Sequence, residues 1–533
     1  MPPQSQDPHA EWFLTAQERD NPDTQIPTWV GGNTAEPLFH GKTYFDRLVT
    51  EVETLGDGDH LFFTDWRGDP DERMREDGPT VSELFAAAAR RGVIVKGLLW
   101  RSHADKLAYS QEENRNLSEG IAEAGGEVLL DQRVRRGGSH HQKLVVLRHP
   151  SAPERDIAFA GGIDLCHSRR DDEHHRGDPQ PLAMAKAYGD NPPWHDVQLA
   201  LRGPVVGALD LTFRERWTDP APLDQHGPIS TVVDKLKHAD LRADRLPPQP
   251  PDPPACGTHN IQVLRTYPAM RPPYGFAKLG EQSIARGYTK AIKRARRLIY
   301  LEDQYLWSTE VARLFADALT DNPELHLVAV VPRHPDVDGR FALPPNEIGR
   351  EEAISLCRRA APDRVHVFDV ENHEGTPVYV HAKVCVADDV WASVGSDNLN
   401  RRSWTHDSEL SCAVLDDTRD ERAPADPAGL GDGARVYARE LRLALMREHL
   451  DRAPGEDKDL VDPDDAVRAV SAAADALRAW HDGGRKGPRP PGRLMPHETT
   501  PLPWWQKLWA LPAYRLVYDP DGRPWRDRRA GNW

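Results

Sequence analysis

A polar His-x-Lys motif that leads into an apolar strand and ends at a glycine turn occurs twice in this chain of 533 residues. The first copy begins at residues 141–143 (HQK) and ends at the turn 161–165 (GGIDL). The second begins at residues 381–383 (HAK) and ends at 395–399 (GSDNL), and the two histidines lie 240 residues apart. A motif repeated at this spacing predicts that the chain holds two related copies of one domain.

Helical and strand-like periodicities alternate before each copy of the motif. The expected helices are 41–55, 81–91, 116–124, 281–296 and 348–360, and the expected strands are 60–64, 93–99, 127–130, 139–147, 158–165, 260–267, 298–306, 325–331, 364–370 and 379–388. Such alternation is typical of a sheet whose faces are covered by helices. We therefore predict an α/β fold of two duplicated α/β-sandwich halves with pseudo-twofold symmetry, mixed sheets covered by helices, and a C-terminal helical extension.

A stiff proline-rich stretch, PPQPPDPP at 247–254, separates the two copies. It predicts a domain boundary. We expect an N-terminal half over 1–245, a linker over 246–258, a second half over 259–416, and a helical, Trp- and Pro-rich extension over 417–533. For the tryptophans of that extension two roles stay open, namely packing as a cover over the halves and anchoring at a lipid–water boundary.

Charge and hydropathy bear on whether the protein binds nucleic acid or spans a membrane. The chain carries 68 Lys and Arg against 84 Asp and Glu, a net charge of −16, which argues against a protein that binds nucleic acid through phosphate contacts. No run approaches the ~18 apolar residues of a membrane span, and the first residues lack a secretory signal pattern. We expect a cytoplasmic monomer, with peripheral contact to a membrane as an option.

The repeated motif itself suggests the chemistry. Residues i and i+2 of an extended segment project from one face, so His141 with Lys143, and His381 with Lys383, each place an imidazole beside an ammonium. Two such pairs facing one another suit an anionic phosphodiester. One histidine attacks phosphorus while the other protonates the departing alcohol.

Substrate contacts are expected from residues that surround the two motifs. They are Asp164, Ser396 and Asn398 in the glycine turns, and Glu302 and Gln304 at the end of another strand. For Glu302 and Gln304 the alternative stays open that they only end the strand and make no contact with substrate. The acid–histidine run at 171–175 (DDEHH) resembles metal-ligand spacing, but such runs are common on surfaces, and we expect no metal and no cofactor. The lysines supply the positive charge that a metal would bring.

The two motifs resemble the signature of the phospholipase D superfamily, His-x-Lys-x4-Asp in two copies. The second copy is complete, with His381, Lys383 and Asp388, whereas the first has Arg148 at the position of the aspartate. That position lies five residues beyond the lysine, so its change bears on local strand–loop structure more than on catalysis.

Segments outside the motifs resemble the members of this superfamily that cleave phosphatidylcholine-like lipids. They are 193–206 (PWHDVQLALRGPVV), 213–217 (FRERW) and 301–305 (LEDQY). By this resemblance Asp196 accepts the Nδ1 proton of His141, and either Glu409 or Asp407 accepts that of His381. A carboxylate on Nδ1 fixes the tautomer and leaves Nε2 free to react.

The resemblance implies a two-step hydrolysis at a membrane surface. His141 forms a phosphohistidine, His381 protonates the leaving alcohol and then activates water, and phosphatidate is released. Transfer to a second alcohol, transphosphatidylation, is the related outcome. A superfamily nuclease and a catalytically silent lipid-binding protein, the latter motivated by Arg148, are the alternatives.

Overall fold

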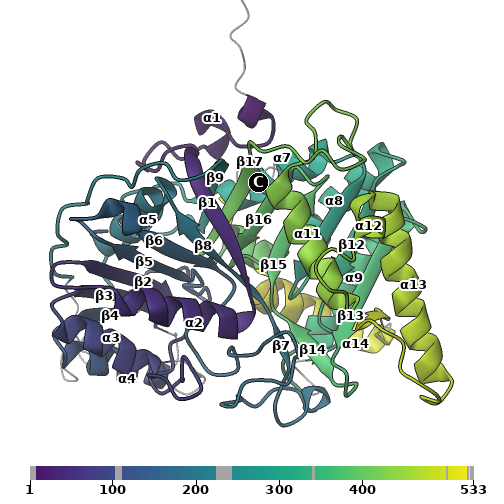
Figure 1. Ribbon diagram of the computed structural model, residues 1–533, viewed down its shortest axis with the longest axis horizontal. Helices are drawn as coiled ribbons and strands as arrows, with labels where there is room; N and C mark the ends of the chain where they lie inside the picture. The colour runs from purple at the N-terminus through teal and green to yellow at the C-terminus, as the bar shows by residue number, and fades with distance from the viewer. Residues whose placement is uncertain are drawn as a thin grey trace, which may run out of the picture.

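The computed structural model describes residues 8–101, 111–223, 243–338, 343–499, 502–524, 527–528 and 533. Two sheets lie side by side, the N-terminal one in purple to blue and the C-terminal one in green, with helices over their faces (Figure 1). In the part of the chain that is described, every helix falls short of the length and apolarity that a membrane crossing requires.

The N-terminal sheet has seven main strands, and its spatial order differs from its sequence order. From the inner edge outward the strands are β1 (Val30–Phe39), β8 (Val197–Arg202), β6 (Ile157–Gly161), β5 (Leu144–Arg148), β2 (His60–Asp65), β3 (Ile94–Trp100) and β4 (Glu127–Asp131). The first four pairings are antiparallel and the last two are parallel. The sheet is therefore mixed, as the sequence predicts.

The C-terminal sheet repeats this order. Its strands are β9 (His259–Tyr267), β17 (Glu409–Asp416), β16 (Trp391–Gly395), β15 (Lys383–Ala387), β11 (Leu298–Asp303), β12 (His326–Val330) and β13 (Val365–Glu371). Four antiparallel pairings are again followed by two parallel ones. Since β1 also pairs antiparallel with β9, the two halves meet at equivalent inner strands. The fold class and its duplication are confirmed.

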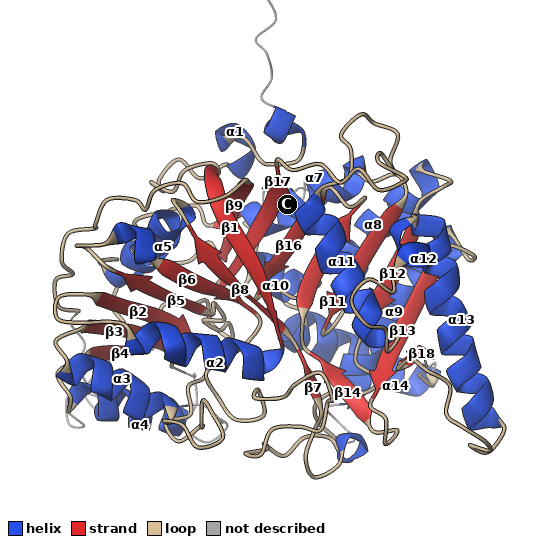
Figure 2. Cartoon of the chain, viewed as in Figure 1, coloured by secondary structure: helices blue, strands red, loops and turns tan. Residues whose placement is uncertain are grey.

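Helices cover both sheets in corresponding places (Figure 2). In the N-terminal half they are α2 (His40–Glu53), α3 (Val81–Arg90), α4 (Gln111–Ala122) and α5 (Val205–Trp217). In the C-terminal half they are α7 (Ser283–Arg294), α8 (Thr309–Asp321), α9 (Leu343–Ala360), α11 (Val436–His449) and α13 (Pro463–Asp482). The shorter elements are α1 (Ala16–Arg19), α10 (Arg401–Thr405), α12 (Lys458–Val461), α14 (Trp504–Ala513), β7 (Trp194–His195), β10 (Glu281–Gln282), β14 (Pro377–Val380) and β18 (Leu494–Pro496).

The alternation of side chains along each strand builds a core on both faces of each sheet. In β2, Leu61 and Phe63 pack in the cluster under α2 and α3, while Phe62 points to the other face. Phe62 there shares one central cluster with Tyr300 of β11 in the other half. Because successive residues of a strand face opposite sides, continuous apolar strands serve both clusters at once.

Neither strand predicted to run through a repeated motif is continuous there. The expected strand 139–147 starts only at Leu144, and the expected strand 379–388 divides into β14 and β15. The reason is tertiary, because the backbone N–H of His141 bonds to the carbonyl of Ser408 (2.9 Å) and that of His381 to the carbonyl of His195 (2.8 Å). The motif histidines are thus held by the opposite half rather than by a ladder in their own sheet.

Part of the expected C-terminal extension packs into the second half. Helix α11 contributes Leu441 and Leu445 to the central cluster, and β18 adds an antiparallel strand to the edge of the sheet beside β13. The proline-rich stretch is held by Arg148, which donates to the carbonyl oxygens of Pro250 (3.2 Å) and Pro251 (2.6 Å). The domain limits themselves stay predictions.

Candidate active site

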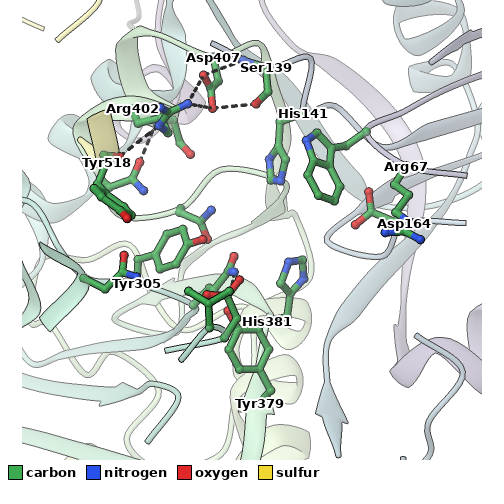
Figure 3. A pocket seen from close by; sticks show the side chains of 18 of the residues that line it. Arg67, Ser139, His141, Asp164, Tyr305, Tyr379, His381, Arg402, Asp407 and Tyr518 are labelled. Carbon is green, nitrogen blue, oxygen red and sulfur yellow. Dashed lines mark hydrogen bonds and ion pairs between the residues drawn. The ribbon is translucent and has the colours of Figure 1, made fainter. Parts of the chain in front are cut away.

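A pocket of about 1150 Å³ holds both motif histidines. His141 enters it from the N-terminal half and His381 from the C-terminal half, and Figure 3 shows the two imidazoles in the same hollow. Lining residues come from loops at the ends of strands in both halves. The structure thus brings together the two copies of the motif, as the duplication predicts.

The imidazole of His141 is held by Glu409, the first residue of β17. The distance from its Nδ1 to the carboxylate is 2.9 Å, and the carboxylate is fully buried. The Ser396 hydroxyl donates to the same carboxylate at 2.5 Å. A carboxylate on Nδ1 leaves Nε2 as the free, basic nitrogen of a neutral imidazole.

The imidazole of His381 is held by Asp196, the residue just before β8. The distance from Nδ1 to the carboxylate is 2.6 Å, and Asp196 is fully buried. Burial lowers the pKa of the His381 imidazolium well below its ordinary value, and the neighbouring Lys383 and Arg169 act in the same direction. Burial also raises the pKa of Asp196.

The predicted pairing of histidines and carboxylates is wrong, because the two are exchanged between the halves. The resemblance implies Asp196 on His141, but Asp196 binds His381, and Glu409 binds His141. The reason is the way the halves meet, since β7 pairs with β14 and places Asp196 next to the His381 loop. A bridge between His140 and Ser408 does the same for Glu409 and the His141 loop.

Asp407, the second candidate for an orienting acid, binds neither histidine. It accepts the backbone N–H of Ser139 (3.0 Å) and its hydroxyl (2.9 Å), and it forms an ion pair with Arg402 (3.1 Å), as Figure 3 shows. Both Asp407 and Arg402 line the pocket. Asp407 therefore shapes the rim rather than orienting an imidazole.

The two motif lysines are almost fully buried behind the histidines. Each ammonium donates to the carbonyl oxygen of the histidine two residues earlier. Lys143 also forms an ion pair with Asp164 at 3.0 Å, whereas Lys383 meets the neutral amide of Gln304 at 3.2 Å. Burial lowers the pKa of Lys383 to about 8. Burial raises the pKa of the Asp164 carboxyl, but the nearby charges of Lys143 and Arg169 lower it by more. The pKa of Asp164 therefore lies below its ordinary value.

Of the expected substrate contacts, three reach the pocket and two do not. Asn398, Gln304 and Asp164 line it, and the Asn398 Oδ1 atom is buried with no hydrogen-bond partner among the described residues. Ser396 is buried behind Glu409, so its predicted contact with substrate is wrong.

The predicted contact of Glu302 with substrate is also wrong. Its carboxylate is buried against His195 (2.6 Å) and His449 (2.7 Å), away from the pocket lining. The chain turns where β11 ends at Asp303, whose carboxylate accepts the N–H groups of the next turn. Gln304 therefore no longer shares the face of Glu302.

Aromatic residues that the sequence reasoning missed form much of the wall. Trp66 stacks on Trp100 with ring centroids 5.7 Å apart. The rings of Trp66 and His141 meet in a T-shaped arrangement with centroids 6.2 Å apart. Trp194 packs on His381 at 4.8 Å, and Tyr305 also lines the pocket. Trp66, Trp100 and Tyr305 come at or just after the carboxyl ends of β2, β3 and β11, where ligand sites of α/β sheets gather. That position is the signal that could have found them.

The arginine in place of the first motif's aspartate has a structural role. Arg148 lies at the far end of β5, fully buried, and forms ion pairs with Asp156 (2.6 Å) and Asp210 (2.9 Å). Asp388, its counterpart, accepts the backbone N–H groups of residues 296–298 at 2.7–2.9 Å. Both positions serve local structure remote from the histidines, as expected.

Comparisons with known proteins agree with this architecture. A family model described as "Phospholipase D" matches residues 71–330, and one described as "Cardiolipin synthase, PLD-like domain" matches 288–422. The chain is 24% identical to "Phospholipase D alpha 1" of Cynara cardunculus over 81% of its own length and 67% of the relative. It is 27% identical to the protein of the same name from Oryza sativa subsp. japonica, over 81% and 66%. The chain thus spans about two thirds of these relatives.

One solved structure supports the fold. The crystal structure of phosphatidylserine synthase from Haemophilus influenzae Rd KW20 superposes with a TM-score of 0.50 at 12% identity. The superposition covers 74% of this chain and 84% of the other. At this identity the likeness concerns the fold alone.

Proposed function

This chain belongs to the phospholipase D superfamily, and from that premise we propose that it cleaves glycerophospholipids such as phosphatidylcholine to phosphatidate and a free alcohol. The observation that carries the proposal is the pair of imidazoles in one pocket, each held at Nδ1 by a buried carboxylate, with a buried lysine behind each histidine. This set supplies a nucleophile, a proton donor and positive charge for a phosphodiester.

The first step forms a covalent intermediate. The free Nε2 of His141 attacks phosphorus, so that a P–N bond forms while the P–O bond to the head-group alcohol breaks. The departing oxygen takes a proton from Nε2 of His381. We assign the stabilisation of the charge on the non-bridging oxygens to Lys143, Lys383 and the Asn398 amide. Asn398 lines the pocket, and the two lysines are buried behind the histidines.

The second step returns the enzyme to its starting state. His381, now neutral, removes a proton from water, and the water oxygen attacks phosphorus as the P–N bond breaks. Phosphatidate leaves and both histidines regain their protonation states. When an alcohol takes the place of water, the product is a new phosphatidyl ester, which is transphosphatidylation.

The opposite assignment of the histidines has one observation in its favour. Burial lowers the pKa of His381, so His381 is neutral in the free pocket, and a neutral imidazole is the form that attacks. Our assignment of the attack to His141 rests on the family resemblance. Mass-spectrometric identification of the histidine that carries the phosphatidyl group decides between the two.

Two features favour a lipid over a nucleic acid as the substrate. The pocket walls are rich in tryptophan and tyrosine, and the chain carries a net charge of −16.

At the rim, Val517 lines the pocket and is 59% exposed. Nearby helix α14 exposes Trp504 (75%) and Leu508 (69%), four residues apart on one face. Exposed Trp and Leu beside a pocket mouth suit a lipid surface.

The test is incubation of the purified protein with phosphatidylcholine vesicles and a small amount of ethanol. We expect phosphatidate and phosphatidylethanol, and neither product with His141→Ala or His381→Ala. Parallel reactions with glycerol and serine as acceptors distinguish a hydrolase from a synthase-type transferase. Cleavage of DNA without lipid turnover would instead establish the nuclease alternative, and neither activity would establish a silent lipid-binding protein.

A further inference from the structure

Behind His381, outside the pocket lining, four side chains from distant parts of the chain converge in the interior. They are His40 at the start of α2, His175 in the loop after β6, His195 in β7, and Glu448 near the end of α11. The three histidines are at most 3% exposed, and the glutamate side chain is 14% exposed. One potential ligand atom of each lies within 4.8 Å of all the others.

The distances place the glutamate at the centre of three imidazoles. The Glu448 carboxylate lies 2.9 Å from Nε2 of His40, 3.1 Å from Nε2 of His175 and 3.3 Å from Nδ1 of His195. These distances are shorter than an acid–histidine run solvated at the surface would require. The DDEHH segment, expected at the surface, therefore contributes its last residue to a buried cluster.

The outer nitrogens of two of the imidazoles have acceptors of their own, which bears on the nitrogens that face the cluster. His175 already has the carbonyl of Trp194 at 3.1 Å from its Nδ1, so in the neutral ring Nε2 presents a lone pair to the glutamate. His195 has Glu302 at 2.6 Å from its Nε2, and its Nδ1 is buried without a hydrogen bond among the described residues. Nε2 of His40 and Nε2 of His175 lie at hydrogen-bond distance from the Glu448 carboxylate, and either a proton on each nitrogen or one shared metal ion satisfies such an arrangement.

We propose that these four residues bind one divalent transition-metal ion, with Zn²⁺ as the first candidate. The ligands are Nε2 of His40 and His175, Nδ1 of His195, and the carboxylate of Glu448. Imidazole and carboxylate are ordinary zinc ligands with bonds of about 2.0–2.2 Å, and four of them in a tetrahedron lie roughly 3.3–3.5 Å apart. The four potential ligand atoms lie within 4.8 Å of one another, so they would move closer together to reach that spacing.

The outer contacts of His175 and His195 are those that metal-bound histidines make. A histidine ligand commonly donates its second N–H to a backbone carbonyl or a carboxylate, which fixes its tautomer. Here the Trp194 carbonyl serves His175, and Glu302 serves His195. Glu302 is itself held by His449 at 2.7 Å and by the Tyr300 hydroxyl at 2.5 Å. These contacts give Glu302 a supporting role in place of the predicted substrate contact.

The position of the site defines what the ion would do. Four protein ligands leave no open coordination position, which is the pattern of a structural metal. The carbonyl of His195 accepts the backbone N–H of His381, and the next residue, Asp196, holds its ring. The ion would also link α2 of the N-terminal half to α11, which packs in the C-terminal half. It would therefore position His381 without touching the substrate.

The experiment measures metal content in protein purified without a polyhistidine tag from zinc-supplemented cells. Inductively coupled plasma mass spectrometry is expected to find about one zinc per chain. His175→Gln and His40→Gln should lose the metal, while His174→Gln, a neighbour with a 56% exposed side chain, should retain it. Glu302→Gln should weaken zinc binding by about 10–100-fold.

A second measurement keeps the test independent of any variant that fails to fold. Removing the metal from wild-type protein with a chelator should lower the melting temperature by about 5 °C or more, and added Zn²⁺ should restore it. Wild-type protein that is folded, contains no metal and does not respond to chelator or Zn²⁺ would overturn the proposal.

Two variants together test the location. His195, Glu302 and His449 form a second candidate group of three. Loss of zinc in His449→Gln with full retention in His40→Gln would place the ion in that group and overturn this assignment. Since metal content and melting temperature need no lipid substrate, the result is separate from the fate of the proposed phospholipase activity.

Discussion

Replacing each orienting carboxylate by its amide separates the two histidines, because each carboxylate holds only one of them. Glu409→Gln acts on His141, and Asp196→Asn acts on His381. Both changes keep the size of a fully buried side chain. The effects therefore report on the lost carboxylate rather than on a cavity.

The magnitude follows from the two contacts. Each amide removes a hydrogen bond to a charged group, worth about 1.5–3 kcal/mol. An amide that donates to Nδ1 also forces the proton onto Nε2, and a protonated Nε2 cannot attack phosphorus. Loss of correctly positioned acid–base chemistry costs ~10²–10⁴ in rate, which is about 2.7–5.4 kcal/mol at 1.36 kcal/mol per tenfold. We expect each variant to fall in that range with phosphatidylcholine.

The assay that separates the variants uses phosphatidyl-p-nitrophenol, whose leaving group departs without protonation. Asp196→Asn should then still form the covalent intermediate, because His141 and Glu409 are intact. It should accumulate a phosphatidyl group on His141, since hydrolysis needs His381. Glu409→Gln should form no intermediate. Peptide mass spectrometry after acid-free quenching measures both, and His381→Ala serves as the control that should match Asp196→Asn.

Two other outcomes contradict parts of the reasoning in distinct ways. An adduct on His141 in Glu409→Gln, together with none in Asp196→Asn, would refute the exchanged pairing of carboxylates. An adduct on His381 that accumulates in Glu409→Gln would keep the pairing and reverse the roles of the histidines.

Three further expectations concern stability, pH and lipid access. Arg148→Ala leaves the buried Asp156 without its arginine partner and leaves Asp210 paired with Arg214 alone. It should lower the free energy of unfolding by about 3–5 kcal/mol in urea titrations, whereas the exposed Arg136→Ala should change it by no more than about 0.5 kcal/mol. Burial lowers the pKa of Lys383 to about 8, so its side chain is a charged ammonium below that pH and a neutral amine above it. We therefore expect kcat/KM to fall as the pH rises through 8. A kcat/KM profile that stays flat well above pH 8 would contradict a role for the charge of Lys383. Trp504→Ala combined with Leu508→Ser should reduce turnover of vesicles but not of dispersed short-chain lipid, and an equal loss on both would argue against an interfacial role for α14.

Much of the fold was predictable because its signals are local. The apolar strands and the helices between them alternate in the same order in both halves, and the strand orders of the two sheets repeat each other. Strand β1 escaped prediction because its alternation is interrupted by glycine and proline. Its place is determined by pairing with β8 and β9, which are far away in the sequence.

The sequence by itself determined that two His-x-Lys motifs exist, and its resemblance to the phospholipase D superfamily implied Asp196 and either Glu409 or Asp407 as their partners. Only the tertiary structure decided which carboxylate serves which histidine, because that depends on the bridges between the halves at β7 and Ser408. The same holds for the cluster of His40, His175 and Glu448, whose members lie too far apart in sequence for any spacing to connect them. Periodicity determines which face of an element a side chain occupies, whereas contacts between elements depend on how those faces pack.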